Sequence, residues 1–314
     1  IVEDVAELDG LTSGELSAAA QAATDRGHEG AYALTLTLYT GHPYLSMLTN
    51  RATRKRLMDA SRTKSNRGGP NDNREVLLEI VRLRADRAAL LGYDNHAAYV
   101  TADETAGSPE AVHALLRQLA PPAAANALRE QAALQAIADA EPEPFALAAE
   151  DWAFYTEKVR QAEYDIDTTA LRPWFEAERV LQDGVFFAAN KLYGVTFTER
   201  PDLVAYHPDA RVFELHNEDG SALGLFVLDL YTRDTKRGGA WMNPIVSQSR
   251  LRGTKPVVVN NLNVPKPAPG EPTLLTLDEV GTLFHEFGHA LHGLFAVVTY
   301  PHFAGTNVFR DFVE

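Results

Sequence analysis

The first part of the chain carries residue patterns that are typical of helices. Residues 15–24 are rich in Ala, a strong helix former, and 74–92 carries a broad apolar stripe that ends at Gly92. In 31–39, by contrast, Leu and Thr alternate with the two-residue period of a half-buried strand. Six helical segments are predicted, over 15–24, 44–61, 74–92, 109–140 with a break at Pro121 and Pro122, 146–165, and 173–193.

Short β-rich runs replace the helical pattern after residue 194. They lie over 195–198, 212–216, 224–230 and 256–261, and turn residues such as those of 217–220 separate them. Helical periodicity returns at Leu277. The pattern therefore predicts a mostly α protein with a small β-sheet. We expect two parts, a mainly helical segment over 1–160 and a segment over 161–314 that contains the sheet and the last helices.

Composition and charge narrow the classes of function. The 314 residues are 45% hydrophobic and 23% charged, which is typical of a globular protein. Asp and Glu outnumber Lys and Arg by 43 to 29, and the net charge of −14 disfavours nucleic acid or an anionic membrane as a partner. Because Cys is absent, disulfides, thiolate metal ligands and a cysteine nucleophile are excluded. No apolar run approaches the roughly 18 residues of a spanning helix, so we expect no membrane partner.

The segment TLDEVGTLFHEFGHALHGLF, which starts at Thr276, carries the clearest chemical signal. Thr276 and Glu279 have the spacing of a capping box and mark the start of a helix. His285 and His289 are four residues apart, so both imidazoles project from one face of that helix and can bind one ion. Glu286 lies between them, where a carboxylate could accept a proton from water. This is the HExxH motif of zinc peptidases.

A catalytic zinc ion normally has three protein ligands, so a third ligand is needed. His292 is seven residues from His285, about 10 Å along the helix axis, which is too far for one ion to bind both. The metzincin pattern is also excluded, because it requires Gly and His at positions 292 and 295. Three candidates remain downstream, His302, Asp311 and Glu314. Residues 308–314 are predicted to form a second helix, and spacing does not choose between Asp311 and Glu314.

The motif and its surroundings resemble the thimet-oligopeptidase/neurolysin family of zinc peptidases. The resemblance rests on HEFGHALHGLF followed by AGTNVFRDFVE. LLGYDNHAAYV, LRPWFEAERV and LDLYTRDTKRGGAWM are similar to the bacterial peptidyl-dipeptidase (dipeptidyl carboxypeptidase) branch. In this family the Glu that ends an F-V-E run, 25 positions after the second His, is the third ligand. The resemblance therefore implies that His285, His289 and Glu314 bind one Zn²⁺ in each chain and that Glu286 is the catalytic acid–base.

The resemblance also implies an activity and an architecture. The expected activity is zinc-dependent hydrolysis of short peptides with release of C-terminal dipeptides. The alternatives are an endo-acting oligopeptidase with the same metal site and a non-catalytic peptide-binding fragment. The implied fold is a two-lobed helical molecule with a deep central channel, in which 1–160 contributes to the channel walls and 161–314 is the catalytic segment. A cytoplasmic monomer is expected, or a periplasmic one if a signal peptide has been lost.

The two ends of the sequence predict a piece of a longer protein. The first residue is Ile1, and the last residue, Glu314, stands inside a run that reads as a helix. By resemblance, members of the family are about twice this length, and the groups that stabilise the oxyanion and bind the substrate carboxylate follow the F-V-E run. We therefore expect a chain limited to these residues to contain the metal site but to have little or no peptidase activity.

Overall fold

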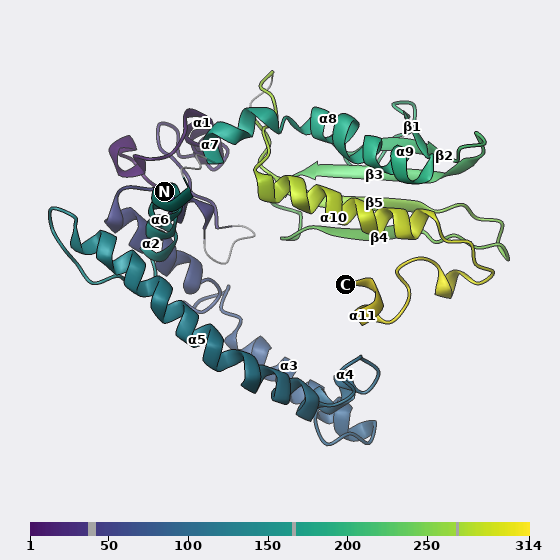
Figure 1. Ribbon diagram of the computed structural model, residues 1–314, viewed down its shortest axis with the longest axis horizontal. Coiled ribbons are helices and arrows are strands. Elements are labelled where there is room, and N and C mark those ends of the chain that lie inside the picture. The colour runs from purple at the N-terminus through teal and green to yellow at the C-terminus, as the bar shows by residue number, and fades with distance from the viewer. Residues whose placement is uncertain (37–41, 165–167, 268–269) are drawn as a thin grey trace. The chain divides into compact units, whose positions relative to one another are not determined.

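The chain folds into two units, Ile1–Ile166 and Asp167–Glu314, each with its own apolar core (Figure 1). The computed structural model describes residues 1–36, 42–164, 168–267 and 270–314. In these residues no helix is both long enough and apolar enough to cross a membrane.

Helices form nearly all of the regular structure in the first unit. At the start of α1, the Thr12 hydroxyl accepts a hydrogen bond from the Glu15 N–H, and the Glu15 carboxylate accepts one from the Thr12 N–H. One apolar cluster surrounds Leu8 and Leu48, and a second one surrounds Tyr155. The α-helices are α1 (Ser13–Thr24), α2 (Arg51–Arg62), α3 (Arg74–Leu90), α4 (His96–Thr101), α5 (Pro109–Asp139) and α6 (Trp152–Tyr164).

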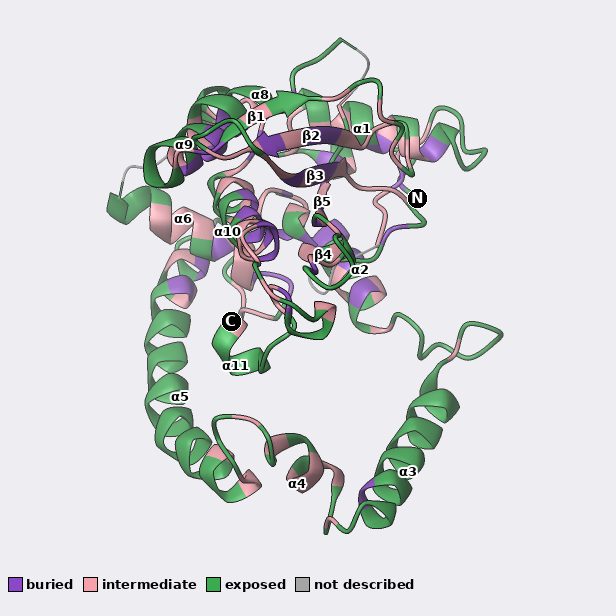
Figure 2. Ribbon diagram, turned by 90° about the vertical axis from the view of Figure 1, so that its right-hand side faces the viewer, coloured by how far each residue is buried: buried purple, intermediate pink, exposed green. Residues whose placement is uncertain are grey.

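The apolar stripe of α3 is mostly exposed. Within α3 the one buried residue is Ala88. Six of the large apolar side chains are between 40% and 60% exposed, namely Val76, Leu77, Leu78, Ile80, Val81 and Leu83. Figure 2 shows this as a helix that is green along nearly all its length. The spacing of these residues predicted the helix, whereas their burial depends on contacts that the rest of this unit does not provide.

The second unit is built around a mixed five-stranded sheet with the strand order β1-β2-β3-β5-β4. β3 and β5 are parallel, and the other neighbouring pairs are antiparallel. In this register Asn260 of β5 lies between Leu228 of β3 and Met242 of β4. The strands are β1 (Thr196–Glu199), β2 (Arg211–His216), β3 (Ala222–Tyr231), β4 (Trp241–Val246) and β5 (Val257–Val264).

α10 (Leu277–Leu294) covers one face of this sheet, and its apolar side chains form the main core with the strands. Phe287 packs edge-on against Phe226 of β3, with ring centroids 5.2 Å apart. Gly293 allows the helix to approach β5 closely, because a Cβ atom there would lie 2.9 Å from Cγ1 of Val258. The remaining helices are α7 (Thr168–Leu171), α8 (Ala177–Arg179), a π-helical turn (Val180–Phe186), α9 (Phe187–Tyr193) and α11 (Arg310–Val313).

The structure confirms a mostly helical chain with a small sheet, and it corrects three local predictions in the first unit. The helix predicted over 44–61 begins only at Arg51, where the Asn50 side chain caps α2, and Pro43–Ser46 is a separate 3-10 turn. Residues 31–36 form no strand beyond an isolated bridge between Tyr32 and Val2, because the N–H of Ala33 bonds to the carbonyl of Ala19 in α1. The rest of the predicted strand, 37–39, lies outside the described residues. Pro121 and Pro122 do not break α5, which is continuous. This part of α5 is exposed, so water can bond the carbonyls that the prolines leave without a donor.

Two further corrections concern the second unit. The sequence pattern missed β4, whose run contains Pro244 and ends with exposed residues. β4 is an edge strand, where a proline need not interrupt the ladder because one side of the strand has no neighbour. The helix predicted over 308–314 is only the single turn Arg310–Val313.

Candidate metal centre

α10 places the two histidines of the HExxH motif. The predicted capping box is present: the Thr276 hydroxyl accepts from the Glu279 N–H at 3.1 Å, and the Glu279 carboxylate accepts from the Thr276 N–H at 2.7 Å. Starting there, the 3.6-residue period turns Leu283, Phe287, Ala290 and Leu294 into the core. His285 and His289 consequently lie on the other side of the helix, with side chains 58% and 15% exposed.

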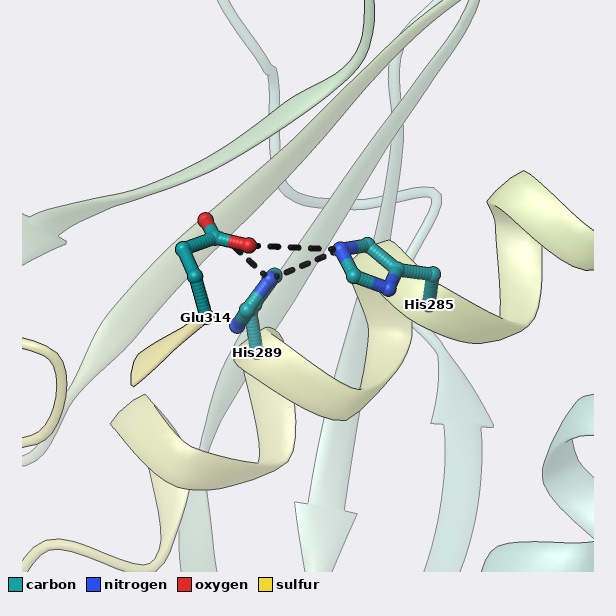
Figure 3. Close-up of side chains that lie close together, drawn as sticks. All are labelled: His285, His289 and Glu314. Atoms are coloured by element: carbon teal, nitrogen blue, oxygen red, sulfur yellow. Dashed lines mark hydrogen bonds and ion pairs between the residues drawn. The ribbon is translucent and has the colours of Figure 1, made fainter. Parts of the chain in front are cut away.

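Glu314 lies beside these two histidines at the end of α11 (Figure 3). The Nε2 atoms of His285 and His289 are 3.0 Å apart. The carboxylate of Glu314 places Oε2 at 3.9 Å from Nε2 of His285 and Oε1 at 3.8 Å from Nε2 of His289. Two imidazole nitrogens and the two oxygens of one carboxylate group therefore lie close enough together to hold one metal ion.

These distances fit a zinc ion. In a tetrahedral site with ligand atoms about 2.05 Å from Zn²⁺, neighbouring ligand atoms are about 3.3 Å apart. The observed separations of 3.0, 3.8 and 3.9 Å bracket that value. Imidazole nitrogen and carboxylate oxygen are also ordinary zinc ligands, and three protein ligands leave one position of the tetrahedron open.

Glu286 projects from the same turn of α10 but is buried, with 6% exposure. Its Oε2 atom has no hydrogen-bond partner. Burial raises the pKa of Glu286 above the ordinary value of a glutamate, while the neighbouring His285 and His289 partly oppose this rise. A buried carboxyl group with a raised pKa and unused bonding capacity is suited to accept and release a proton.

The other residues considered as ligands are not part of this group. Among the described residues, the set whose ligand atoms lie within 4.8 Å of one another is His285, His289 and Glu314. Neither His302 nor Asp311, which spacing had left open, belongs to that set. His292 instead lines an open hollow at the C-terminal end of α10, together with Tyr193, Phe295 and Phe303.

Comparison with known proteins shows the family to which the chain belongs. Residues 44–314 match the model of peptidase family M3. The chain is 44% identical over 314 residues to the dipeptidyl carboxypeptidase of Escherichia coli, with 100% of this chain and 46% of that protein covered. It is 45% identical over 313 residues to the dipeptidyl carboxypeptidase of Salmonella typhimurium, with the same coverage. It is 40% identical over 299 residues to oligopeptidase A of Escherichia coli, with 93% of this chain and 44% of that protein covered.

The chain spans about half the length of these curated relatives. The family model nevertheless covers most of the chain, including the whole of α10 and Glu314. The resemblance inferred from the sequence motifs is thereby confirmed, and the chain belongs to peptidase family M3.

Proposed function

We propose that this chain carries the metal site of a zinc-dependent peptidase that hydrolyses short peptides and releases C-terminal dipeptides. The observation that carries the proposal is the convergence of His285, His289 and Glu314, with Glu286 buried beside them. The reaction type is supported by the 44% identity over the whole chain to a dipeptidyl carboxypeptidase.

His285, His289 and Glu314 would hold one Zn²⁺ through Nε2, Nε2 and the carboxylate. A zinc ion supplies Lewis acidity at such a site, which polarises a scissile carbonyl group and makes water easier to deprotonate. Glu286 would accept the proton from the attacking water at its free Oε2 and then pass it to the leaving amine. Because Glu286 is held on the same helix turn as His285, the proton acceptor and the ligands keep a fixed spacing.

A second candidate is an endo-acting oligopeptidase with the same site, which the 40% identity to oligopeptidase A favours. The two activities differ in their products and not in the residues named above. The finer expectations from the sequence stay predictions. They are the two-lobed fold with a deep channel, the division into 1–160 and 161–314, a monomeric state, and a cytoplasmic or periplasmic location.

Zinc content tests the proposal on the purified chain, and product masses test it on a full-length protein of the family that contains these residues. We expect one zinc per chain, measured by elemental analysis. In the full-length protein we expect stepwise loss of dipeptides from the C-terminus of a free octapeptide, and this loss should stop when a chelator is added. Glu314→Ala should weaken zinc binding at least tenfold in a chelator competition, since one of three ligands is lost. His302→Ala is the matched control, because this exposed histidine lies outside the ligand set.

Glu286→Gln separates binding from chemistry. The variant should retain zinc and lose activity by roughly 100-fold or more, because the amide cannot accept the proton. Internal cleavage of the octapeptide would favour the endo-acting enzyme. Normal turnover by Glu286→Gln, or zinc binding that survives the loss of both His289 and Glu314, would refute the assignment.

A further inference from the structure

The packed interface between α10 and the sheet contains one buried polar side chain on each side. The buried residues of α10 are Leu283, Glu286, Phe287, Ala290, Gly293 and Leu294. Glu286 is the polar member of that set. On β5, alternate residues face the same core, and these are Val258, Asn260, Leu262 and Val264. Asn260 is the polar member of this second set.

Asn260 is completely buried, with 0% exposure. Neither Nδ2 nor Oδ1 of its side chain has a hydrogen-bond partner, and the same holds for Oε2 of Glu286. A buried polar group without a partner is costly, so native proteins rarely retain one without a reason. Two such groups on facing surfaces of one interface therefore call for a common explanation.

Contacts along α10 show which part of β5 Glu286 faces. Near the C-terminal end of the helix, Leu294 lies beside Gly224 of β3, because a Cβ atom at Gly224 would meet it. Phe287, seven residues earlier in the helix, packs on Phe226, which comes later in β3. The helix thus runs antiparallel to β3 and to its parallel neighbour β5. A Cβ at Gly293 would meet the side chains of Val258 and Met242.

Glu286 lies seven residues before Gly293, on the same side of the helix and about 10 Å along its axis. On a strand that distance corresponds to about three residues. Counted from Val258 toward the end of β5, the position reached lies between Asn260 and Leu262. Of these two residues, Asn260 has a polar side chain, and it is paired in register with Met242, the residue that position 293 also approaches.

We propose that Asn260 is a positioning residue for Glu286, whose carboxylate accepts a hydrogen bond from Nδ2 of Asn260 either directly or through one buried water. This inference rests on the proposed role of Glu286 as proton acceptor. The amide fixes the carboxylate rotamer next to the ligand histidines, and, being neutral, it does so without adding a second negative charge beside Glu286 and Glu314.

A double-mutant cycle on the unfolding of the full chain tests the pairing without reference to activity. The variants are Asn260→Leu, Glu286→Leu and the double variant, unfolded with urea in the presence of a chelator so that metal binding does not contribute. Asn260→Leu should destabilise the otherwise native chain, because Glu286 loses its partner. In the Glu286→Leu background it should be neutral or stabilising. The expected coupling is about tenfold in the unfolding equilibrium constant.

Asn263→Leu is the matched control, since Asn263 is on the same strand but donates to the carbonyls of Arg237 and Gly239. The effect of Asn263→Leu on the free energy of unfolding should be the same with and without the Glu286→Leu substitution. Additive effects of Asn260→Leu and Glu286→Leu would overturn the proposal. Should Asn260→Leu fail to fold, Asn260→Ala gives the same cycle, because it removes the amide without adding bulk.

Kinetics distinguish positioning from simple packing. In a zinc-loaded, full-length protein of the family that contains these residues, Asn260→Leu should lower kcat at least tenfold while KM and zinc content stay unchanged. A change in zinc content or in KM alone would count against the positioning role. The two proposals fail separately. If the double-mutant cycle shows coupling but Glu286→Gln is active, the proposed function is refuted. If Glu286→Gln is inactive but the effects of Asn260→Leu and Glu286→Leu are additive, the pairing is refuted.

Discussion

Asp229 is the centre of a buried ion network on the face of the sheet opposite to α10. Its carboxylate is fully buried and accepts from Nη1 and Nη2 of Arg233, at 2.9 and 2.8 Å, and from the Tyr206 hydroxyl at 2.8 Å. The ammonium group of Lys236, whose side chain is 2% exposed, donates to Asp229 Oδ1 and to the carbonyls of Asp229 and Tyr231. Asp229→Ala would therefore leave a buried cation without its counter-ion.

The structure sets the size of the expected loss. Burial lowers the pKa of Lys236 because it disfavours the charged form, and Asp229 partly opposes this effect. If Asp229 is removed, Lys236 can at worst lose its proton. At pH 7, starting from an ordinary pKa of 10.5, deprotonation costs about 4.8 kcal/mol at about 1.36 kcal/mol per pH unit. Removing one partner of a buried pair generally costs about 3–5 kcal/mol. We therefore expect Asp229→Ala to lower the free energy of unfolding of the second unit by about 3–5 kcal/mol.

Urea unfolding followed by circular dichroism and tryptophan fluorescence measures this loss. The double variant Asp229→Ala/Lys236→Met should recover most of it, because the buried ammonium group is gone and the other cation of the network, Arg233, has a side chain that is 25% exposed and can be hydrated. Asp209→Asn is the matched control: it breaks the ion pair with Lys266, whose side chain is 52% exposed, and should cost less than about 1 kcal/mol. A loss below 1 kcal/mol for Asp229→Ala, or no recovery in the double variant, would refute the reasoning.

Two other predictions concern burial in each unit. Desolvation lowers the pKa of buried His42 from 6.5 to about 4, although its hydrogen bond to Thr35 partly opposes this. Because His42 binds its proton at a higher pH in the unfolded chain than in the folded one, the free energy of unfolding of the first unit should fall by about 3 kcal/mol as the pH falls from 6.5 to 4. His42→Phe should remove that slope from urea unfolding measured across this range, and parallel curves for the two proteins would contradict it. Gly293→Ala places a Cβ 2.9 Å from Cγ1 of Val258 and should lower the free energy of unfolding by about 1–3 kcal/mol. Gly281→Ala, with open space at its Cβ, should instead stabilise α10 by up to about 1 kcal/mol, and equal thermal shifts for the two variants would contradict the packing argument.

Local patterns were sufficient to predict α10 and the placement of its histidines. The capping residues Thr276 and Glu279, the helical period, and the four-residue spacing of His285 and His289 all act within a few turns of one helix. The geometry of such a segment follows from backbone hydrogen bonds between near neighbours, so the sequence alone predicts it well. The same reasoning explains why most of the other helices and four of the five strands were found.

Spacing did not choose the third member of the site. His302, Asp311 and Glu314 were all compatible with it, and only the family resemblance singled out Glu314. In the structure Glu314 lies near the histidines because the chain between α10 and α11 folds back toward the helix (Figure 1). No periodicity encodes such a return, since it depends on how the intervening chain packs.

Burial and pairing were likewise decided by the tertiary structure. β4 exists because β5 lies beside it, and Pro244 is tolerated because β4 is at the edge. Asp229 and Lys236 are charged residues that sequence rules place at the surface, yet the strand and the loop after it bury them together. The sequence by itself determined the local elements and the chemistry of the HExxH motif. Which residues share a site or a core was decided by contacts between segments far apart in the chain, because the free energy of such contacts depends on the whole packed structure.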